Sequence, residues 1–344
     1  MCGLDPLSRK NFDHRRDWIE HRLADLAEIF AVSIWSYAVM SNHVHAVIEI
    51  RAEAAQAWSA DVVALRWLRL YPSKAESAER AAEVLAGSTA RIEVLRKRLC
   101  SLSWFMKSLN EPIARRANAE DECTGRFWEG RFTSQPLLDE AAVMSAMTYV
   151  DLNPIRAGIT DTLEGSRHTS VVKRIEALAA TQAAVGESEV QKLGPTPQDL
   201  RSTEKPSERS APIGQHASTL QGQMTAPAIE PGAPEDARTA PLTAVLGLTG
   251  SLVAAISTRE YIELVDLAGR DWHPRKRGRI SGPPPAVLAK LGIAPDRWID
   301  HVKAVKPKAG FWRAIGGEEA LTAKAAAMGQ HWLRGLNVAR SLQS

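Results

Sequence analysis

Two histidines in the stretch Tyr37–Ile50, YAVMSNHVHAVIEI, are the residues whose types and spacing point most directly to chemistry. His43 and His45 are separated by one residue, and the apolar, β-prone run 46–48 that follows predicts a strand. Side chains at i and i+2 of a strand point to the same face, so the two imidazoles would project together. They could share a divalent metal ion, although two buried, hydrogen-bonded histidines fit the same pattern. A metal site would need a third ligand from elsewhere in the chain.

A second candidate group lies in the segment 139–153, DEAAVMSAMTYVDLN, whose apolar spacing predicts a helix. Asp139 suits its N-cap, and Pro154 places Asn153 at the helix end because proline cannot continue the hydrogen bonds. Tyr149 and Asn153 are four residues apart and would share a face of the helix. A tyrosine in such a position is usually a packing residue, so the spacing alone does not assign it a role.

Basic and aromatic residues interleave in the segment 125–132, GRFWEGRF. This segment reads either as a turn followed by a strand with its aromatic rings packed inside, or as Arg126 and Arg131 binding phosphate while an aromatic ring stacks on a base. A run of arginines and lysines between positions 96 and 116 has two readings as well, because it could be a solvated helix face or one side of a nucleic-acid groove.

Composition sets wide limits on the function. The 344 residues carry a formal net charge of +3, which is weak evidence for a polyanionic partner. The three cysteines are odd in number and form no CxxC pair, so we expect neither a disulfide framework nor a cysteine-rich zinc site, as suits a reducing cytosol. The first 17 residues have no apolar run of a signal peptide, and glycines interrupt the longest uncharged stretch, 240–258. We therefore expect a cytoplasmic protein with no membrane span.

The pattern along the chain predicts three parts. Residues 1–165 combine helices, at 11–31, in part of 51–73 and at 75–110, with strands at 33–39 and 43–50. Residues 166–240 read as a linker that is largely disordered from about residue 181, because large apolar residues almost vanish there. Residues 241–344 read as a small, basic, all-α domain. Its densest basic patch, which we interpret as a phosphate-contact surface rather than a solvated loop, contains Arg275, Lys276, Arg277 and Arg279.

Three motifs in order, MSNHVHAVIE, GRFWEGRF and YVDLNPIRAG, resemble those of the single-tyrosine HUH transposases. The closest subgroup is the REP-associated tyrosine transposases, relatives of the insertion-sequence 200-like enzymes. The resemblance covers about Asn11–Gly158 and then Ser166–Arg174. It implies an α+β fold, namely a ferredoxin-like HUH domain with an antiparallel sheet and flanking helices, followed here by the linker and the small all-α domain.

The resemblance also implies roles for individual residues. His43 and His45 match the pair that binds Mg²⁺ or Mn²⁺, and Asn153 matches the third metal contact. Tyr149 matches the nucleophile that cleaves single-stranded DNA, leaves a 5′-phosphotyrosine link and allows strand transfer at palindromic, REP-like hairpins. Arg126, Arg131, Arg156 and the basic patch at 275–279 are then the candidates for DNA binding. A homodimer in the bacterial cytoplasm, associated with the nucleoid, is the expected state.

One departure from the family pattern affects the sheet. Family members begin with a β-strand before the first helix, and this sequence starts after that point, so the sheet would lack a strand and expose an edge. Two other functions therefore stay open. One is a truncated or domesticated DNA-binding protein that keeps the fold and has no nuclease activity. The other is an unrelated metal-dependent hydrolase that uses His43, His45 and Glu49, which alternation places on the same strand face.

Overall fold

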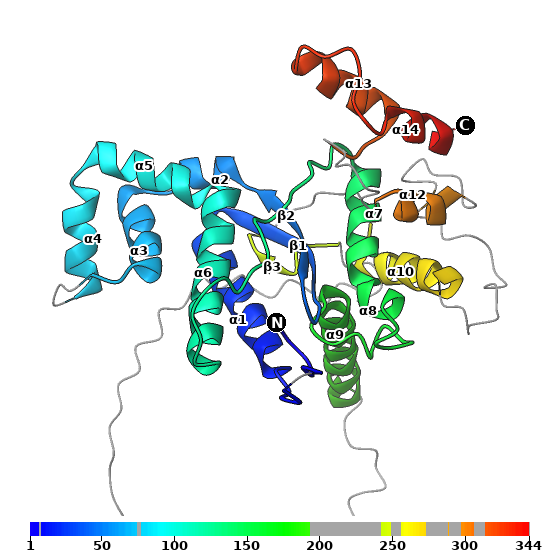
Figure 1. The fold of residues 1–344 in the computed structure, drawn as a ribbon, viewed down its shortest axis with the longest axis horizontal. Helices are drawn as coiled ribbons and strands as arrows, with labels where there is room; N and C mark the ends of the chain where they lie inside the picture. The colour runs from blue at the N-terminus through cyan, green and yellow to red at the C-terminus, as the bar shows by residue number, and fades with distance from the viewer. Residues whose placement is uncertain are drawn as a thin grey trace, which may run out of the picture.

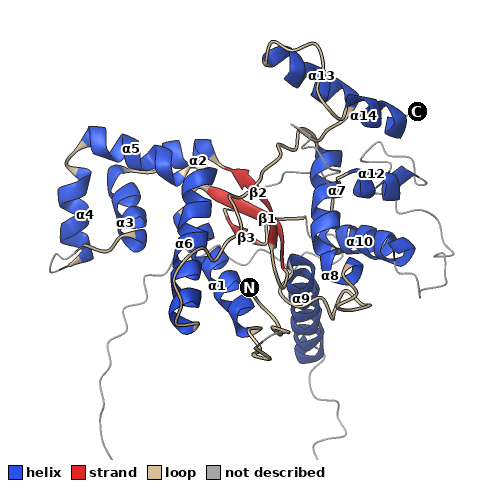
Figure 2. Ribbon diagram, in the orientation of Figure 1, coloured by secondary structure: helices blue, strands red, loops and turns tan. Residues whose placement is uncertain are grey.

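A small antiparallel sheet lies at the centre of the molecule, with helices on both of its sides (Figure 1) (Figure 2). The computed structural model describes residues 1–6, 8–73, 77–192, 242–248, 256–272, 288, 297–305 and 314–343. The three strands are β1 (Val32–Val39), β2 (Val44–Ile50) and β3 (Leu246–Gly247), in the order β2-β1-β3. This arrangement of strands and helices confirms the predicted α+β class.

The helices before residue 121 lie on one side of the sheet and in an excursion beyond it (Figure 1). They are α1 (His14–Ile29), α2 (Ala52–Ala57), α3 (Ala60–Leu70), α4 (Ala78–Ala86), α5 (Thr89–Leu99) and α6 (Leu102–Glu120). The later helices lie on the other side of the sheet, with α13 and α14 farther from it (Figure 1). They are α7 (Glu140–Asp151), α8 (Asn153–Arg156), α9 (Ser170–Lys192), α10 (Thr258–Trp272), α12 (Trp298–Ala304), α13 (Glu318–Ala327) and α14 (Leu336–Gln343).

Strand β1 is buried along its whole length, because both of its faces are covered. One face packs against α1, α5 and α6 through an apolar cluster that includes Leu23, Phe30 and Phe105. The opposite face packs against α7, α10 and α12 in a second cluster. A bulge between Ile34 and Ser36 interrupts the pairing with β2. Six of the eight residues of β1 are apolar, as suits a strand that is covered on both faces.

The edge of β1 that faces away from β2 is paired, whereas β2 is an edge strand and pairs with no strand on its outer side among the described residues. Strand β3 covers its first part, where Val245 N–H donates to Ile34 O at 2.8 Å and Leu248 N–H donates to Val32 O at 3.0 Å. Gly247 has φ of +87°, and a Cβ there would lie 2.4 Å from the Val32 carbonyl oxygen. Only glycine fits this close approach of two backbones.

The second part of the same edge is satisfied by the start of α9 and the residues before it. Val39 N–H donates to His168 O at 3.0 Å, and Tyr37 N–H donates to the Ser170 hydroxyl at 3.1 Å. The buried Arg174 guanidinium donates to Trp35 O at 2.7 Å. Buried backbone groups need such partners, so this edge of the sheet is closed without a strand from the N-terminus.

The core on the α7 side joins residues that are distant in the sequence. A single cluster of buried apolar side chains contains Trp35 of β1, Met147 of α7, Tyr261 of α10 and Trp298 of α12. The segments 242–248, 256–272 and 297–305, which the sequence assigns to a separate helical domain, thus share a core with the sheet. Helix α9 occupies 170–192, where the sequence predicts a linker, and residues 193–241 lie outside the described part of the chain.

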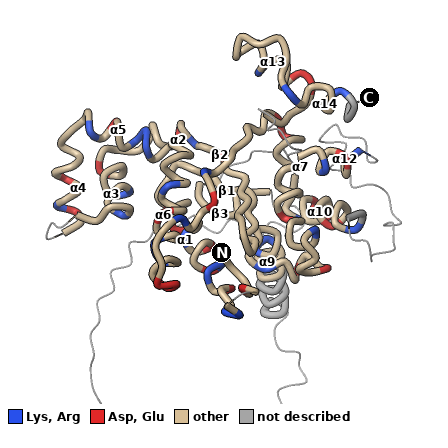
Figure 3. The backbone as a smooth tube through the Cα atoms, viewed as in Figure 1, with Lys and Arg blue, Asp and Glu red and all other residues tan. Residues whose placement is uncertain are grey.

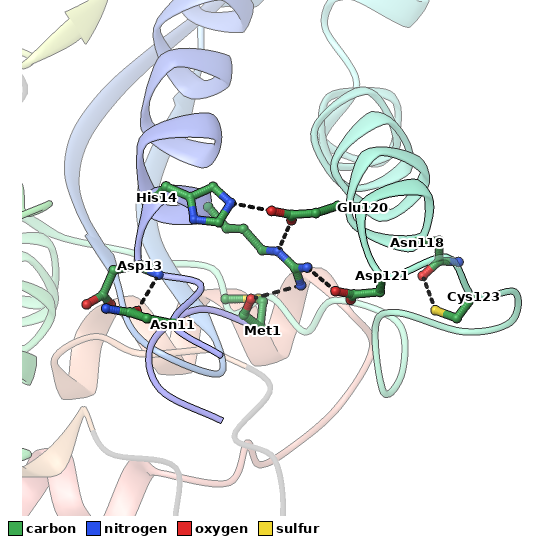
Figure 4. Close-up of polar contacts among 9 residues, drawn as sticks. Met1, Asn11, Asp13, His14, Asn118, Glu120, Asp121 and Cys123 are labelled. Carbon is green, nitrogen blue, oxygen red and sulfur yellow. Dashed lines mark hydrogen bonds and ion pairs between the residues drawn. The ribbon is translucent and has the colours of Figure 1, made fainter. Parts of the chain in front are cut away.

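The first residues of α1 are held by polar contacts to the end of α6 (Figure 4). The buried Arg15 guanidinium forms ion pairs with Glu120 and Asp121, and His14 Nε2 lies 2.6 Å from the Glu120 carboxylate. Asp13 precedes α1, but its side chain makes no cap hydrogen bond. The N–H of residue 2 donates to Ser41 O at 2.7 Å. The N-terminal segment therefore packs against the turn that leads to the two histidines.

Candidate active site

The histidine pair faces helix α7 at the start of strand β2. The His43 and His45 ring centroids are 4.7 Å apart, and the rings are nearly perpendicular. His45 is paired with Ala38 of β1, whose side chain belongs to the core on the α7 side. The His45 ring centroid lies 6.0 Å from that of Tyr149, which is buried near the C-terminal end of α7. The structure thus brings together two imidazoles and a phenol from segments that are about a hundred residues apart.

The surroundings of the two imidazoles favour their neutral forms. Burial lowers the pKa of His45 to about 4, and the nearby charges of His43 and Arg156 act in the same direction. Burial also lowers the pKa of His43, which is the more exposed of the two. Both rings are therefore neutral near pH 7, and the neutral imidazole is the form that binds metal ions.

Asn153 keeps contact with the helix that carries the tyrosine, although it begins the short helix α8. Its Nδ2 group donates to Tyr149 O at 3.0 Å and to Val150 O at 3.2 Å. Two carbonyl acceptors fix the orientation of the amide, because only the nitrogen can donate to them. The oxygen Oδ1 is then the atom of Asn153 that could bind a metal. Helix α7 itself begins as predicted, since the Asp139 carboxylate accepts from Ala142 N–H at 2.8 Å.

The predicted DNA-binding arginines lie in different environments. The Arg156 guanidinium carbon lies 4.2 Å from the centroid of the Tyr149 ring, so this cation is at the site. Arg126 and Arg131 are exposed on the segment between α6 and α7. That segment contains no strand, and the predicted strand there is wrong. The residues at 275–279 lie outside the described part of the chain.

The aromatic side chains of GRFWEGRF explain why this segment is not a strand. The Trp128 indole Nε1–H donates to Asn110 O of α6 at 2.9 Å, and the Phe127 ring lies 5.1 Å from the Trp128 ring, measured between centroids. Both rings pack against the core on the α1 and α6 side. The segment therefore packs on α6 through its side chains. The buried aromatic rings agree with the first of the two readings, in which the rings pack inside the protein.

A buried polar group next to the tyrosine was not predicted from the sequence. Asp151 is fully buried and accepts hydrogen bonds from the Ser170 hydroxyl, from Val171 N–H at 3.1 Å and from the Tyr261 hydroxyl. Burial raises the pKa of Asp151 to about 6, and the hydrogen bonds oppose this effect. The group joins the end of α7 to α9 and α10. Nothing in the local sequence pattern of Tyr261 indicates this partner, because it lies 110 positions away.

The third residue of the hydrolase alternative is already engaged. The Trp35 indole Nε1–H donates to the Glu49 carboxylate at 3.0 Å, and the Arg51 guanidinium lies 3.7 Å from the same oxygen. In the part of the chain that the structure describes, the histidine pair belongs to no group of three His, Cys, Asp or Glu ligands. Asparagine is not one of these four residue types, so Asn153 could still supply a third ligand through its amide oxygen.

A different group of three possible metal ligands lies between α1 and the start of α9. One ligand atom each of Asp17, Glu20 and His168 falls within 4.8 Å of the others. His168 Nδ1 lies 2.9 Å from Glu20, whose carboxylate also accepts from the Tyr37 hydroxyl at 2.5 Å. The Lys173 ammonium lies 3.9 Å from Glu20. The group could bind a divalent cation, although Glu20 already contacts His168, Tyr37 and Lys173.

Comparison with protein-family models, with characterised proteins and with solved structures gave no match to this chain. The candidate site therefore rests on its own residues and their geometry. Within the described residues, no helix combines the length and the apolar character needed to cross a bilayer.

Proposed function

We propose that this protein cleaves and rejoins single-stranded DNA, with Tyr149 as the nucleophile and His43 and His45 as metal ligands. The observation that carries the proposal is the 6.0 Å separation of the His45 and Tyr149 rings, beside a second imidazole on the same face. A phenol next to two neutral imidazoles suits metal-assisted phosphoryl transfer to a tyrosine. The motifs at these positions and their order support the same assignment.

The donor atoms suit a divalent cation of the Mg²⁺ or Mn²⁺ type. Two imidazole nitrogens and the Asn153 amide oxygen form a nitrogen and oxygen set, with other positions left for substrate oxygens and water. When bound, the metal would polarise the scissile phosphate and offset the charge that develops on it.

The residues of the chain supply the remaining chemistry. The Tyr149 oxygen attacks phosphorus, a P–O bond to Tyr149 forms, the P–O3′ bond breaks, and the phenol proton leaves with the released 3′-hydroxyl or with water. Attack by a free 3′-hydroxyl on the phosphotyrosine reverses these bond changes and joins DNA ends. The Arg156 guanidinium, which rests against the Tyr149 ring, is positioned to contact a phosphate oxygen next to the nucleophile.

The substrate and setting belong to the same proposal. Palindromic, REP-like hairpins in single-stranded DNA are the substrates, and a homodimer in the bacterial cytoplasm, associated with the nucleoid, is the acting form. The exposed Arg126 and Arg131 bind the DNA backbone away from the reacting phosphate. The basic patch at 275–279 adds sequence-independent affinity.

A covalent-adduct assay tests the nucleophile. Full-length protein is incubated with labelled hairpin oligonucleotides and Mn²⁺, and protein–DNA adducts are separated on a denaturing gel. We expect an adduct with the wild type, none with Tyr149→Phe, and at least about a 100-fold reduction with His43→Ala/His45→Ala. Arg80→Glu, which reverses an exposed charge on α4 away from the candidate site, is the control and should retain the adduct. An adduct that survives Tyr149→Phe refutes the assignment.

A DNA-binding protein without nuclease activity is the second candidate. It is favoured by one observation, namely that the histidine pair has no carboxylate partner among the described residues. Hairpin binding by the wild type without any adduct in Mg²⁺ or Mn²⁺ would select this candidate over the enzyme.

A further inference from the structure

Aromatic and basic side chains meet where α3, α5 and α6 come together. The Trp67 ring centroid lies 4.9 Å from that of Tyr71 and 5.6 Å from that of Trp104. The Arg98 guanidinium carbon lies 5.4 Å from the Trp67 ring and 4.5 Å from the Trp104 ring, and Lys107 Nζ lies 5.0 Å from the Trp104 ring. We call these five residues the aromatic platform.

The two cations of the platform differ from their neighbours in what they contact. Within the described ranges, Arg98 and Lys107 form no ion pair with a carboxylate. Other arginines on the same helices do, as Arg96 does with Glu93 and Arg115 with Glu111. A cation held on ring faces keeps its charge available to an anion from outside.

The surroundings of the platform are basic and accessible. Helices α5 and α6 together contain seven arginines and lysines against three glutamates, and Figure 3 shows this charge along both helices. Tyr71 is 43% exposed, and Trp67 and Trp104 are half-buried, so part of each ring reaches solvent. From the sequence, this basic run could be either a solvated helix face or one side of a nucleic-acid groove. The structure shows that two tryptophans lie beside it.

Aromatic rings next to uncommitted cations match the chemistry of single-stranded nucleic acid. Unpaired bases stack on aromatic faces, whereas their phosphates need cations within a few ångströms. A duplex offers no free base faces, and an acidic peptide offers charge without rings. The combination therefore favours a single-stranded DNA segment over either of these partners.

We propose that the aromatic platform binds single-stranded DNA by stacking bases on Tyr71 and the tryptophans while Arg98 and Lys107 contact phosphates. The choice of DNA as the ligand rests on the proposed function. The platform lies on helices outside the candidate active site, so it is a second DNA contact and takes no part in the chemistry at Tyr149.

Binding to a labelled oligothymidine, measured by fluorescence anisotropy in EDTA, tests the proposal with the full-length chain. We expect Arg98→Glu/Lys107→Glu to weaken binding at least about 10-fold, and Tyr71→Ala about 5-fold or more. Arg80→Glu is the matched control, because it reverses an exposed charge on α4 that already pairs with Glu83, and it should change affinity less than about twofold. Thermal melts confirm that each variant is folded.

Two further probes separate stacking from charge. An abasic oligonucleotide of equal length should bind at least about 5-fold more weakly than oligothymidine and should not respond to Tyr71→Ala. A polyglutamate peptide should bind more weakly still. Equal affinity of all three probes, or unchanged oligothymidine binding in both platform variants, would overturn the proposal. Because Tyr71 is exposed, its variant remains informative even if the double variant does not fold.

The adduct assay allows this proposal and the catalytic proposal to be tested independently. Loss of binding in the platform variants, with no Tyr149 adduct in the wild type, would support the platform and refute the nuclease. Undiminished adduct formation by Arg98→Glu/Lys107→Glu at subsaturating DNA would refute the platform and leave the nuclease standing.

Discussion

The two faces of the central sheet are built in different ways. The face that packs on α1, α5 and α6 is closed by apolar side chains such as Leu23 and Phe105, from helices within the first 120 residues. The face that packs on α7 and α10 contains most of the buried polar side chains of the described chain, with Asp151 among them. It also contains buried residues of α10 and α12, whereas the first face receives from beyond position 241 only the partly buried Val245 and Leu246 among the described residues.

This difference indicates that the two faces are stabilised by different kinds of interaction. The first face is stabilised by non-directional burial of apolar area, which tolerates small adjustments. The second face depends on directed hydrogen bonds, which lose much of their value when one partner is displaced. The candidate site lies on the second face. The positions of His45 and Tyr149 therefore depend on the face that is more sensitive to small displacements.

Removal of the Asp151 carboxylate should cause the largest effect. Asp151→Ala leaves Ser170, Val171 and Tyr261 without their common acceptor inside the core. We expect the free energy of unfolding to fall by about 4 kcal/mol, as measured by urea denaturation.

Ser145→Ala is the control for this variant. Ser145 lies on the same helix and is also buried, but its hydroxyl has no hydrogen-bond partner among the described residues. Its loss should cost less than about 1 kcal/mol. Similar losses for the two variants would mean that the polar group does not hold the second face together.

A cavity in the other face should have a somewhat smaller effect. Leu23 is fully buried against the sheet, and Leu23→Ala should lower the free energy of unfolding by about 3 kcal/mol through lost burial and the cavity left behind. The substitution neither adds nor removes an ionisable group, so this loss of stability should be the same at pH 6 and pH 8. A loss that varies with pH would contradict the proposed contrast between the faces.

The smallest effect should come from Glu20 at the margin of the first face. Burial tends to raise the pKa of Glu20, but hydrogen bonds from His168 and Tyr37 outweigh it and hold the pKa below its ordinary value of 4.5. The stability from these contacts is therefore present above that value and is lost as the pH falls through the lower pKa of the folded state.

Glu20→Gln measures this contribution. We expect the variant to be about 1 kcal/mol less stable than the wild type at pH 7, with the difference shrinking as the pH falls from about 5 to 3. Denaturation curves across that range check the expectation. A difference that grows toward acid pH would mean that the hydrogen bonds do not favour the ionised carboxylate.

Local rules predicted much of the site. The shared face of His43 and His45 follows from the alternation of side chains in a strand, and helix α7 follows from apolar spacing and the Asp139 cap. The contact between Asn153 and Tyr149 follows from four-residue spacing. These relations span few residues, so the sequence contains the information needed to infer them.

Pairings between distant segments were not predictable in the same way. Strand β3 has two residues, too few for any periodicity, and its pairing with β1 is decided by tertiary packing. The Asp151–Tyr261 hydrogen bond joins two ordinary-looking positions. The strand predicted in GRFWEGRF failed because a turn-like glycine and aromatic pattern does not distinguish pairing with a strand from side-chain packing on α6.

The position of Gly247 against β1 has a consequence for genetics. Any premature stop codon between about 193 and 245 would spare every predicted catalytic residue and still delete the strand that closes the sheet edge, together with α10. Such an allele would encode a complete set of reactive side chains on an unfinished core, a product suited to proteolytic clearance rather than to activity. A missense change at codon 247 would act in the same way, because any side chain there would meet the Val32 carbonyl. Null alleles should therefore map far downstream of the tyrosine codon.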